Sequence, residues 1–271
     1  MHSEEKMNSL KQHIKSLGSA LIAFSGGVDS TFLLAVSKEV LKQRVLAVTA
    51  IGPTYPQRES MECVRIARKL DVNYLVVNID PFKVAGFSDN PPERCYLCKY
   101  QLFSKLKEIA RDRGFEHVAD GSNVDDLSDI RPGLKALREL GIASPLLESG
   151  LNKSEIRQLS RRMRLETSEK PAAACLSSRF VHGERISNQK LKMVEAAEDY
   201  LLGLGIKQVR VRMHQDLARI EVGDNERHKL LSEAAMDKID SHLRQLGFRY
   251  ITLDMQGYRT GSMNSGQVPS D

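Results

Sequence analysis

The chain has 271 residues, of which 41% are hydrophobic and 28% are charged, and its formal net charge is +5. A length of this order suits one large domain, or a large domain with a small one. The modest positive charge suits anionic small molecules and does not by itself indicate nucleic acid. No apolar run reaches the ~18 residues needed to cross a bilayer, and residues 1–6 have no signal-peptide pattern. We therefore expect a cytoplasmic protein without membrane contact.

An apolar run at residues 20–24 leads into the most informative motif. The run ends in the sequence Ser25-Gly26-Gly27-Val28-Asp29-Ser30, and apolar residues at helical spacing follow. A strand, a glycine turn and a helix N-terminus leave backbone N–H groups free to bind an anion. We therefore predict a phosphate or pyrophosphate site made by Ser25, Gly26, Gly27, Ser30 and the nearby Thr31. It is not a Walker loop, because no G-x-x-x-x-G-K-[ST] occurs.

This motif resembles the PP-loop of the N-type ATP pyrophosphatases, which split ATP between its α and β phosphates. The resemblance implies that Asp29 helps to hold Mg²⁺ on the phosphates. A bridging hard cation also explains why a carboxylate lies in an anion pocket. The plainer interpretation is a Gly-Gly turn in which Asp29 and Ser30 only cap a helix.

Strand and helix patterns alternate along the first part of the chain. Strands are expected at 45–51, 74–79 and 117–119, with helices at 97–113 and 152–163 among them. This alternation predicts an α/β fold with a doubly wound parallel sheet. Ligands of such sheets lie at the C-terminal ends of the strands, where Ser25, Thr49 and Asp120 are expected.

A second polar cluster follows the strand at 117–119. It has the sequence Asp120-Gly121-Ser122-Asn123-Val124-Asp125-Asp126, with Arg131 downstream. Carboxylate oxygens suit a hard cation and Arg131 could bind a phosphate, so we assign Asp120, Gly121 and Arg131 to the nucleotide and Asp125 to Mg²⁺. The alternative is an ordinary turn, because Asp-Gly and Ser-Asn are turn formers.

Three of the four cysteines carry the next prediction. Cys95 and Cys98 begin a helix, and Cys175 lies on an irregular segment far along the chain. Three thiolates would leave one position open on a [4Fe-4S] cluster or on zinc. The alternatives are a redox pair, a zinc site completed by a histidine, or unconnected thiols. Cys63 is expected opposite the apolar stripe of its helix, without a chemical task.

The last third of the chain predicts a small α-β-β-α-β module. Its expected elements are an amphipathic helix at 187–204, a hairpin at 209–222, a helix at 225–246 and a strand at 250–253. Arg210 and Arg212 project from one face of the hairpin, and convergence with Arg179 and Arg259 would form an anion site. The expected boundaries are 1–183, 184–264 and a disordered tail at 265–271.

Taken together, the chain resembles the LarE family of ATP-dependent sulfur transferases in nickel-pincer cofactor synthesis. The resemblance spans nearly the whole chain, and residues 246–264 carry its most distinctive part. It implies that ATP adenylates a carboxylate of pyridinium-3,5-biscarboxylate mononucleotide, and that sulfur then displaces AMP to give the thiocarboxylate. It also implies a homo-oligomer, with the four arginines binding the substrate.

The family has two sources of sulfur. One subgroup sacrifices a cysteine in the loop that corresponds to residues 173–177, whereas the other binds a [4Fe-4S] cluster through three cysteines and delivers an added sulfide. Cys95, Cys98 and Cys175 fit the second pattern, and Cys175 as a sacrificial donor is the alternative. Other possibilities are a PP-loop tRNA thiolase, an amide-forming PP-loop ligase and a non-catalytic nucleotide sensor.

Overall fold

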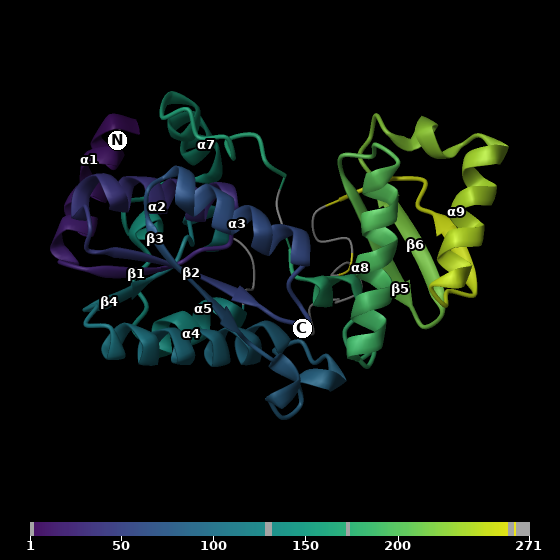
Figure 1. Ribbon diagram of the computed structural model, residues 1–271, viewed down its shortest axis with the longest axis horizontal. Coiled ribbons are helices and arrows are strands. Elements are labelled where there is room, and N and C mark those ends of the chain that lie inside the picture. The colour runs from purple at the N-terminus through teal and green to yellow at the C-terminus, as the bar shows by residue number, and fades with distance from the viewer. Residues whose placement is uncertain (1–2, 128–131, 172–173, 260–262, 264–271) are drawn as a thin grey trace, which may run out of the picture. The chain divides into compact units, whose positions relative to one another are not determined.

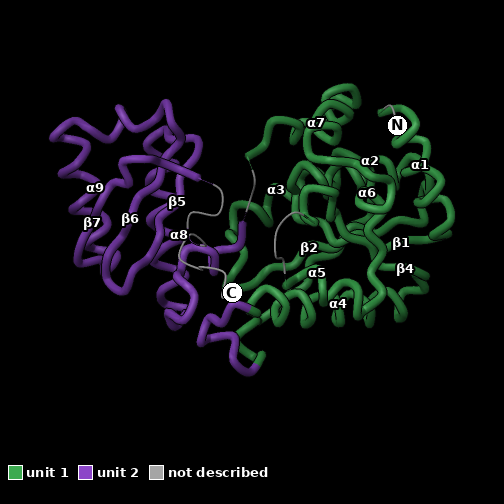
Figure 2. The backbone as a smooth tube through the Cα atoms, turned by 180° about the vertical axis from the view of Figure 1, so that it is seen from behind, with its two compact units in different colours: residues 1–84, 93–173 green, residues 85–92, 174–271 purple. Residues whose placement is uncertain are grey.

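The computed structural model describes residues 3–127, 132–171, 174–259 and 263. The chain forms two compact units, which Figure 2 distinguishes by colour: residues 1–84 with 93–173, and residues 85–92 with 174–271. The longer part of the second unit thus begins at residue 174, whereas the sequence predicts a second domain from residue 184. Within the described ranges, none of the helices combines the length and the apolarity that crossing a bilayer would require.

The first unit is built on a four-stranded sheet in the order β3-β2-β1-β4, with every pairing parallel. Its strands are β1 (Ala20–Ala23), β2 (Val45–Ile51), β3 (Asn73–Asn78) and β4 (His117–Ala119). Its helices are α1 (Ser3–Ser16), α2 (Val28–Leu41), α3 (Gln57–Lys69), α4 (Arg94–Asp112), α5 (Pro132–Glu139), α6 (Pro145–Glu148) and α7 (Lys153–Arg162). Two short 3₁₀ turns, η1 (Pro81–Lys83) and η3 (Val124–Leu127), complete it.

Helices cover both faces of this sheet, and the strand sequences show why. Side chains alternate between the faces of a strand. Ile22 accordingly packs in the core that α1, α2 and α7 share, whereas Leu21 packs against α4 and α5. Figure 1 shows α4 and α5 on one side of the sheet, with α2 and α3 on the other. The predicted α/β class with a doubly wound parallel sheet is confirmed.

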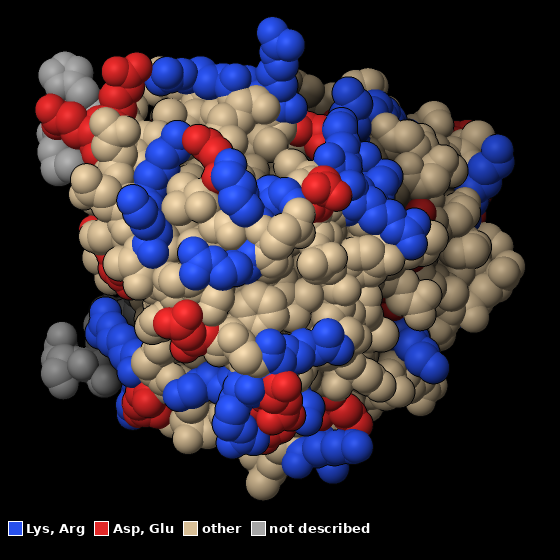
Figure 3. All heavy atoms as spheres, turned by 60° about the vertical axis from the view of Figure 1, so that its left-hand side comes forward, with Lys and Arg blue, Asp and Glu red and all other residues tan. Residues whose placement is uncertain are grey.

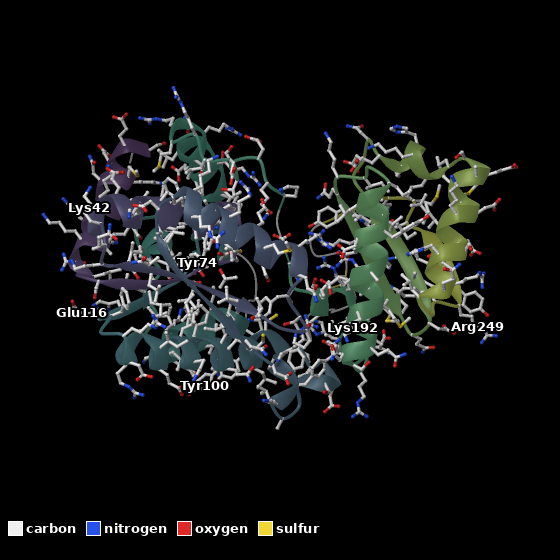
Figure 4. All side chains as sticks on the ribbon, viewed as in Figure 1. Lys42, Tyr74, Tyr100, Glu116, Lys192 and Arg249 are labelled. Atoms are coloured by element: carbon white, nitrogen blue, oxygen red, sulfur yellow. The ribbon has the colours of Figure 1, made fainter. Side chains whose placement is uncertain are left out.

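The sheet has β3 at one edge. Tyr74 and Val76 of this strand are partly exposed, and the Arg68 guanidinium lies over the Tyr74 ring at 5.6 Å from its centroid. Figure 4 labels Tyr74 on this strand. A cation beside an edge strand is a common protection against pairing with another chain.

The second unit contains a three-stranded sheet in the order β5-β6-β7. Its strands are β5 (Val209–His214), β6 (Leu217–Val222) and β7 (Tyr250–Leu253), and its helices are α8 (Asn188–Gly203) and α9 (Glu233–Gln245). Three 3₁₀ turns, η2 (Phe87–Asp89), η4 (Leu176–Arg179) and η5 (Arg227–Leu230), accompany them. The expected small α-β-β-α-β module is present, with β5 and β6 antiparallel and β6 and β7 parallel.

Two local features of this unit differ from expectation. The helix expected over 225–246 is interrupted, because Ser232 starts α9 by accepting a hydrogen bond from the Ala235 N–H at 3.3 Å. Residues 85–92 also belong here. The Gly183 and Ile186 N–H groups donate to the carbonyls of Asn90 and Ser88 at 2.9 and 2.8 Å. The expected tail at 265–271 lies outside the described residues.

Candidate functional site

The glycine turn connects β1 to α2, as the motif predicts. Gly26 has a φ of +66°, which side chains other than glycine rarely adopt. The hydroxyls of Ser25 and Ser30 lie 3.0 Å apart, and the Ser30 hydroxyl is 3.3 Å from both the Ser25 N–H and the Gly27 carbonyl. These bonds fix the turn at the N-terminus of α2, and the N-terminus of a helix attracts anions.

Cys63 of α3 lies directly behind this turn. A Cβ atom on Gly26 would lie 2.8 Å from the Cys63 sulfur, so Gly26 is required by both its φ and its neighbour. Cys63 is only 1% exposed and packs in the main core of the unit. Burial raises the pKa of its thiol to about 11. The expectation that Cys63 faces away from the apolar stripe of α3 is therefore wrong.

Thr49 and Asp120 lie at the C-terminal ends of their strands, and both are engaged by neighbouring groups. The Thr49 hydroxyl donates to the Phe24 carbonyl at 2.9 Å. The carboxylate of Asp120 accepts from the hydroxyls of Ser122 and Ser144 at 2.5 and 2.7 Å. Both side chains therefore hold neighbouring loop segments in place at the ends of the strands. Their assignment to the nucleotide stays a prediction.

Gly121 brings this second cluster against the glycine turn. A Cβ on Gly121 would lie 3.0 Å from the Ser30 nitrogen. Lys99 of α4 approaches the same place, with its Nζ 4.0 Å from an Asp120 oxygen. The two sequence motifs thus lie side by side where β1 and β4 end. Arg131, the remaining residue assigned to the nucleotide, lies outside the described residues.

Asp29 forms an ion pair with Lys153, which sequence reasoning missed. The Lys153 ammonium donates to Oδ2 of Asp29, and the Lys153 N–H donates to Oδ2 of Asp125 at 2.9 Å. Oδ1 of Asp29 is buried without a hydrogen-bond partner among the described residues. Burial raises the pKa of Asp29, whereas Lys153 opposes that rise.

Lys153 is the first residue of α7, and a capping box fixes that helix end. Asn152 accepts from the Glu155 N–H at 2.9 Å, and Glu155 accepts from the Asn152 N–H at 3.0 Å. The spacing of Asn152 and Glu155 is typical of a capping box. The position of Lys153 beside Asp29 has no such local signal, because it depends on how α7 packs against α2.

The three cysteines assigned to a metal lie in both units. Cys95 is exposed and Cys98 partly exposed in the first turns of α4 in the first unit, and Cys175 precedes η4 in the second. All four cysteines fall within the described ranges, and none is in a disulfide. Among the side chains that the structure describes, no group of three or more His, Cys, Asp or Glu is placed to hold a metal ion.

The second unit contains a buried network of arginines and glutamates. Arg179 donates to both oxygens of Glu198 at 2.8 and 2.9 Å. Its remaining bonds go to the Ala174 and Cys175 carbonyls at 2.8 and 3.1 Å and to the Ser178 hydroxyl. The exposed fractions of Arg179 and Glu198 are 1% and 0%. This pair holds the backbone around Cys175 against α8.

A second buried carboxylate lies on β6. Arg212 donates to Glu221 at 2.9 Å and to the Ser178 carbonyl at 3.1 Å. Arg219 donates to the other oxygen of Glu221 at 3.0 Å. The arginine face of the hairpin is therefore not exposed to solvent, although the alternating sequence allowed for that. Glu221 had no assigned role in the sequence, and here it lies between two guanidinium groups.

The other two predicted arginines are Arg210, which lies on β5, and Arg259, which comes after β7. Arg210 pairs in register with Glu221, and its guanidinium lies over the Tyr258 ring at 5.3 Å from the centroid. Burial and the neighbouring Arg179 lower the pKa of Arg210. Arg259 is half-exposed and lies 3.5 Å from Asp254. Assignment of these arginines to the substrate stays a prediction.

A parallel sheet with a Ser-Gly-Gly-x-Asp-Ser turn after its first strand defines the PP-loop class of ATP pyrophosphatases. In agreement, a family model described as NAD synthase matches residues 2–115. An uncharacterised protein of Synechocystis is 40% identical over 96% of this chain and 97% of its own. Pyridinium-3,5-bisthiocarboxylic acid mononucleotide synthase of Lactiplantibacillus plantarum is 36% identical over 96% of this chain and 94% of its own. The chain belongs to the LarE family of ATP-dependent sulfur transferases, to which that synthase also belongs.

More distant similarity reaches other PP-loop enzymes. A probable tRNA sulfurtransferase of Methanothermobacter thermautotrophicus is 29% identical over 54% of this chain and 40% of its own. In the view of Figure 3, Asp and Glu side chains lie among the Lys and Arg side chains of this face.

Proposed function

We propose that this protein adenylates a carboxylate of pyridinium-3,5-biscarboxylate mononucleotide and exchanges the AMP for sulfur. The carboxylate oxygen attacks the α phosphate of ATP, and pyrophosphate leaves. Hydrosulfide then attacks the acyl carbon, AMP leaves with the former carboxylate oxygen, and a thiocarboxylate and a proton are released. The second carboxylate reacts in the same way. Support comes from the near full-length similarity to the synthase of L. plantarum.

The observation that carries the nucleotide half of the proposal is Oδ1 of Asp29, a buried carboxylate oxygen beside the glycine turn for which the described part of the chain supplies no hydrogen-bond partner. Mg²⁺ binds one or two protein carboxylates together with substrate phosphates. Asp29 and Asp125 therefore suit Mg²⁺ held mainly by ATP, which would neutralise charge on the departing pyrophosphate. Lys153 already bonds to both residues and provides a fixed positive charge there.

For the sulfur half, we propose that Cys95, Cys98 and Cys175 hold a [4Fe-4S] cluster. Three thiolates are a suitable donor set that leaves one iron open, and Cys95 and Cys98 are three residues apart on one helix, so they share a face. The cluster would supply a site from which an added sulfide is transferred. Cys175 acting as a sacrificial donor is the second candidate, because Arg179 holds the backbone on both sides of this residue.

For the substrate, we propose that the arginine network of the second unit binds its phosphate and its free carboxylate. Arg179, Arg210 and Arg212 outnumber the neighbouring Glu198 and Glu221, so the network is suited to an anion. Arg179 then acts by positioning, since its bonds go to Glu198 and to the loop of Cys175. Arg259 is exposed enough to reach a ligand. The family resemblance supports a homo-oligomer and a cytoplasmic location, where thiols stay reduced.

One set of measurements tests these proposals. Wild type and Cys98→Ala are reconstituted anaerobically with iron and sulfide, and then supplied with ATP, Mg²⁺, sulfide and the dicarboxylate. We expect about four irons per chain in the wild type and their loss in the variant, with thiocarboxylate formed only by the wild type. Mass loss of H₂S from Cys175 after turnover would instead establish the sacrificial route.

Two outcomes would contradict the proposed function and support a different one. Salt-sensitive binding of tRNA with no turnover of the dicarboxylate would identify a tRNA thiolase. ATP binding without pyrophosphate release on any carboxylate would identify a nucleotide sensor.

A further inference from the structure

Lys170 connects the glycine turn with the segment that leads to Cys175. Its ammonium lies 2.8 Å from Glu59, 2.8 Å from Glu62 and 3.2 Å from the carbonyl of Gly26. The side chain is only 15% exposed. The bonds to the two carboxylates raise the pKa of Lys170 against the opposing effect of burial. An ammonium group with three oxygen partners is a fixed attachment point and not a solvated surface charge.

The backbone of the same segment is held by α7. Arg157 donates from Nη1 to the Ser168 carbonyl and from Nη2 to the Lys170 carbonyl, the latter at 2.9 Å. Lys153, one turn earlier on α7, bonds to Asp29 in the glycine motif. Residues 168–170 are therefore held in two ways. The side chain of Lys170 bonds to the glycine turn, and the carbonyls of Ser168 and Lys170 accept hydrogen bonds from Arg157 of α7.

Cys175 is close to this attachment in the chain. The five residues that follow Lys170 can extend over at most ~18 Å. Lys170 thus links the Gly26 carbonyl directly to the start of this short connection. A surface ion pair would provide no such link, because neither of its groups would touch the turn.

We propose that Lys170 is a positioning residue that couples nucleotide binding at the glycine turn to the order of residues 168–171, which precede Cys175 in the chain. The inference rests on the proposed function for the identity of the nucleotide. When the turn closes on the phosphates, the Gly26 carbonyl becomes fixed, and Lys170 with residues 168–171 becomes fixed with it. By reciprocity, order in this segment favours nucleotide binding.

The test is hydrogen–deuterium exchange of peptides within residues 163–178, with and without α,β-methylene ATP and Mg²⁺ at saturation for each variant. The variants are Lys170→Met, which removes the charge, and Lys170→Arg, which keeps it. Lys69→Met is the matched control, since Lys69 also pairs with a glutamate of this unit, Glu166, at 3.2 Å but is 63% exposed. Arg157→Met removes the hydrogen bonds to the Ser168 and Lys170 carbonyls but keeps the ammonium group of Lys170.

We expect the nucleotide to slow exchange in this segment by about 5-fold in the wild type and in Lys69→Met, and by less than about 2-fold in Lys170→Met and Arg157→Met. Lys170→Arg should recover part of the protection. Undiminished protection in Lys170→Met would overturn the inference, because the ligand would then be covering the segment directly. If Lys170→Met does not fold, Arg157→Met decides by the same criterion.

Calorimetric titration of the wild type with the same nucleotide separates the two proposals. Binding without any change in exchange removes the coupling but leaves the proposed function intact. Absence of binding removes the nucleotide site, and the coupling with it.

Discussion

The guanidinium of Arg179 makes two hydrogen bonds to the carboxylate of Glu198, at 2.8 and 2.9 Å, in the interior of the second unit. The same carboxylate accepts the Val211 N–H at 3.0 Å. One ion pair therefore joins α8, β5 and the backbone around Cys175.

Removal of one partner of this pair should be costly. Glu198→Ala leaves the Arg179 charge buried and unpaired, and we expect the free energy of unfolding to fall by about 3–5 kcal/mol. Urea denaturation at neutral pH measures this change. Asp240→Asn is the control, because it breaks the exposed pair between Asp240 and Arg244 and should change stability little. A loss of similar size in both variants would contradict a special role for the buried pair.

The same pair predicts a dependence of stability on pH. Arg179 and the Val211 N–H lower the pKa of Glu198 below its ordinary value of 4.5, although burial acts in the opposite direction. A lowered pKa in the folded state gives stability that is present above pH 4.5 and is lost as the pH falls through the folded pKa. Glu198→Gln should therefore lose less stability than the wild type between pH 6 and pH 3. Parallel curves would show that Glu198 makes no such contribution.

Asp29 should control the metal dependence of the nucleotide reaction. Asp29→Asn keeps the shape of the side chain but removes the charge that Mg²⁺ needs, and we expect pyrophosphate release to fall by about 100-fold or more. The Mg²⁺ concentration for half-maximal nucleotide binding should rise as well. Asp71→Asn is the matched control, because Asp71 is an exposed carboxylate paired with Lys38. An unchanged Mg²⁺ requirement in Asp29→Asn would exclude Asp29 as a ligand.

Gly26 and Cys63 should show coupled effects on the phosphate site. Gly26→Ala introduces a side chain at φ +66° and 2.8 Å from the Cys63 sulfur. The backbone part alone costs about 1–2 kcal/mol. The double variant Gly26→Ala/Cys63→Ala removes the clash but not the backbone strain, so nucleotide affinity should recover only partly. Additive effects of the two substitutions would show that the sulfur does not limit this position.

Much of this architecture could be predicted because its signals are local. The strand at 45–51 and the strand at 250–253 coincide with β2 and β7, since short runs rich in β-branched and other apolar residues predict strands. The spacing of Asn152 and Glu155 is an equally local signal for the start of α7. Ser232 carries a similar cap signal, but the continuous helical pattern around it concealed the break between η5 and α9.

The missed residues depend on contacts between distant parts of the chain. Lys153 and Lys170 look like surface lysines in the sequence, and only the packing of α7 and of residues 168–170 against the glycine turn gives them partners. Glu198 and Glu221 occupy positions that look polar in a helix and a strand. Their burial follows from the arginines that reach them. The prediction for Cys63 was wrong because the side of α3 that faces the glycine turn also packs in the core of the unit.

The cap of α7 has a consequence for work with the protein. Glu155, which closes the capping box, also accepts two hydrogen bonds at 2.8 Å from Lys6 of α1, and Leu10 and Ile14 anchor α1 in the core. Trimming the N-terminal helix would thus loosen the start of α7, where Lys153 lies. A protein shortened in this way should therefore bind nucleotide more weakly, although the cut would not touch the glycine turn itself.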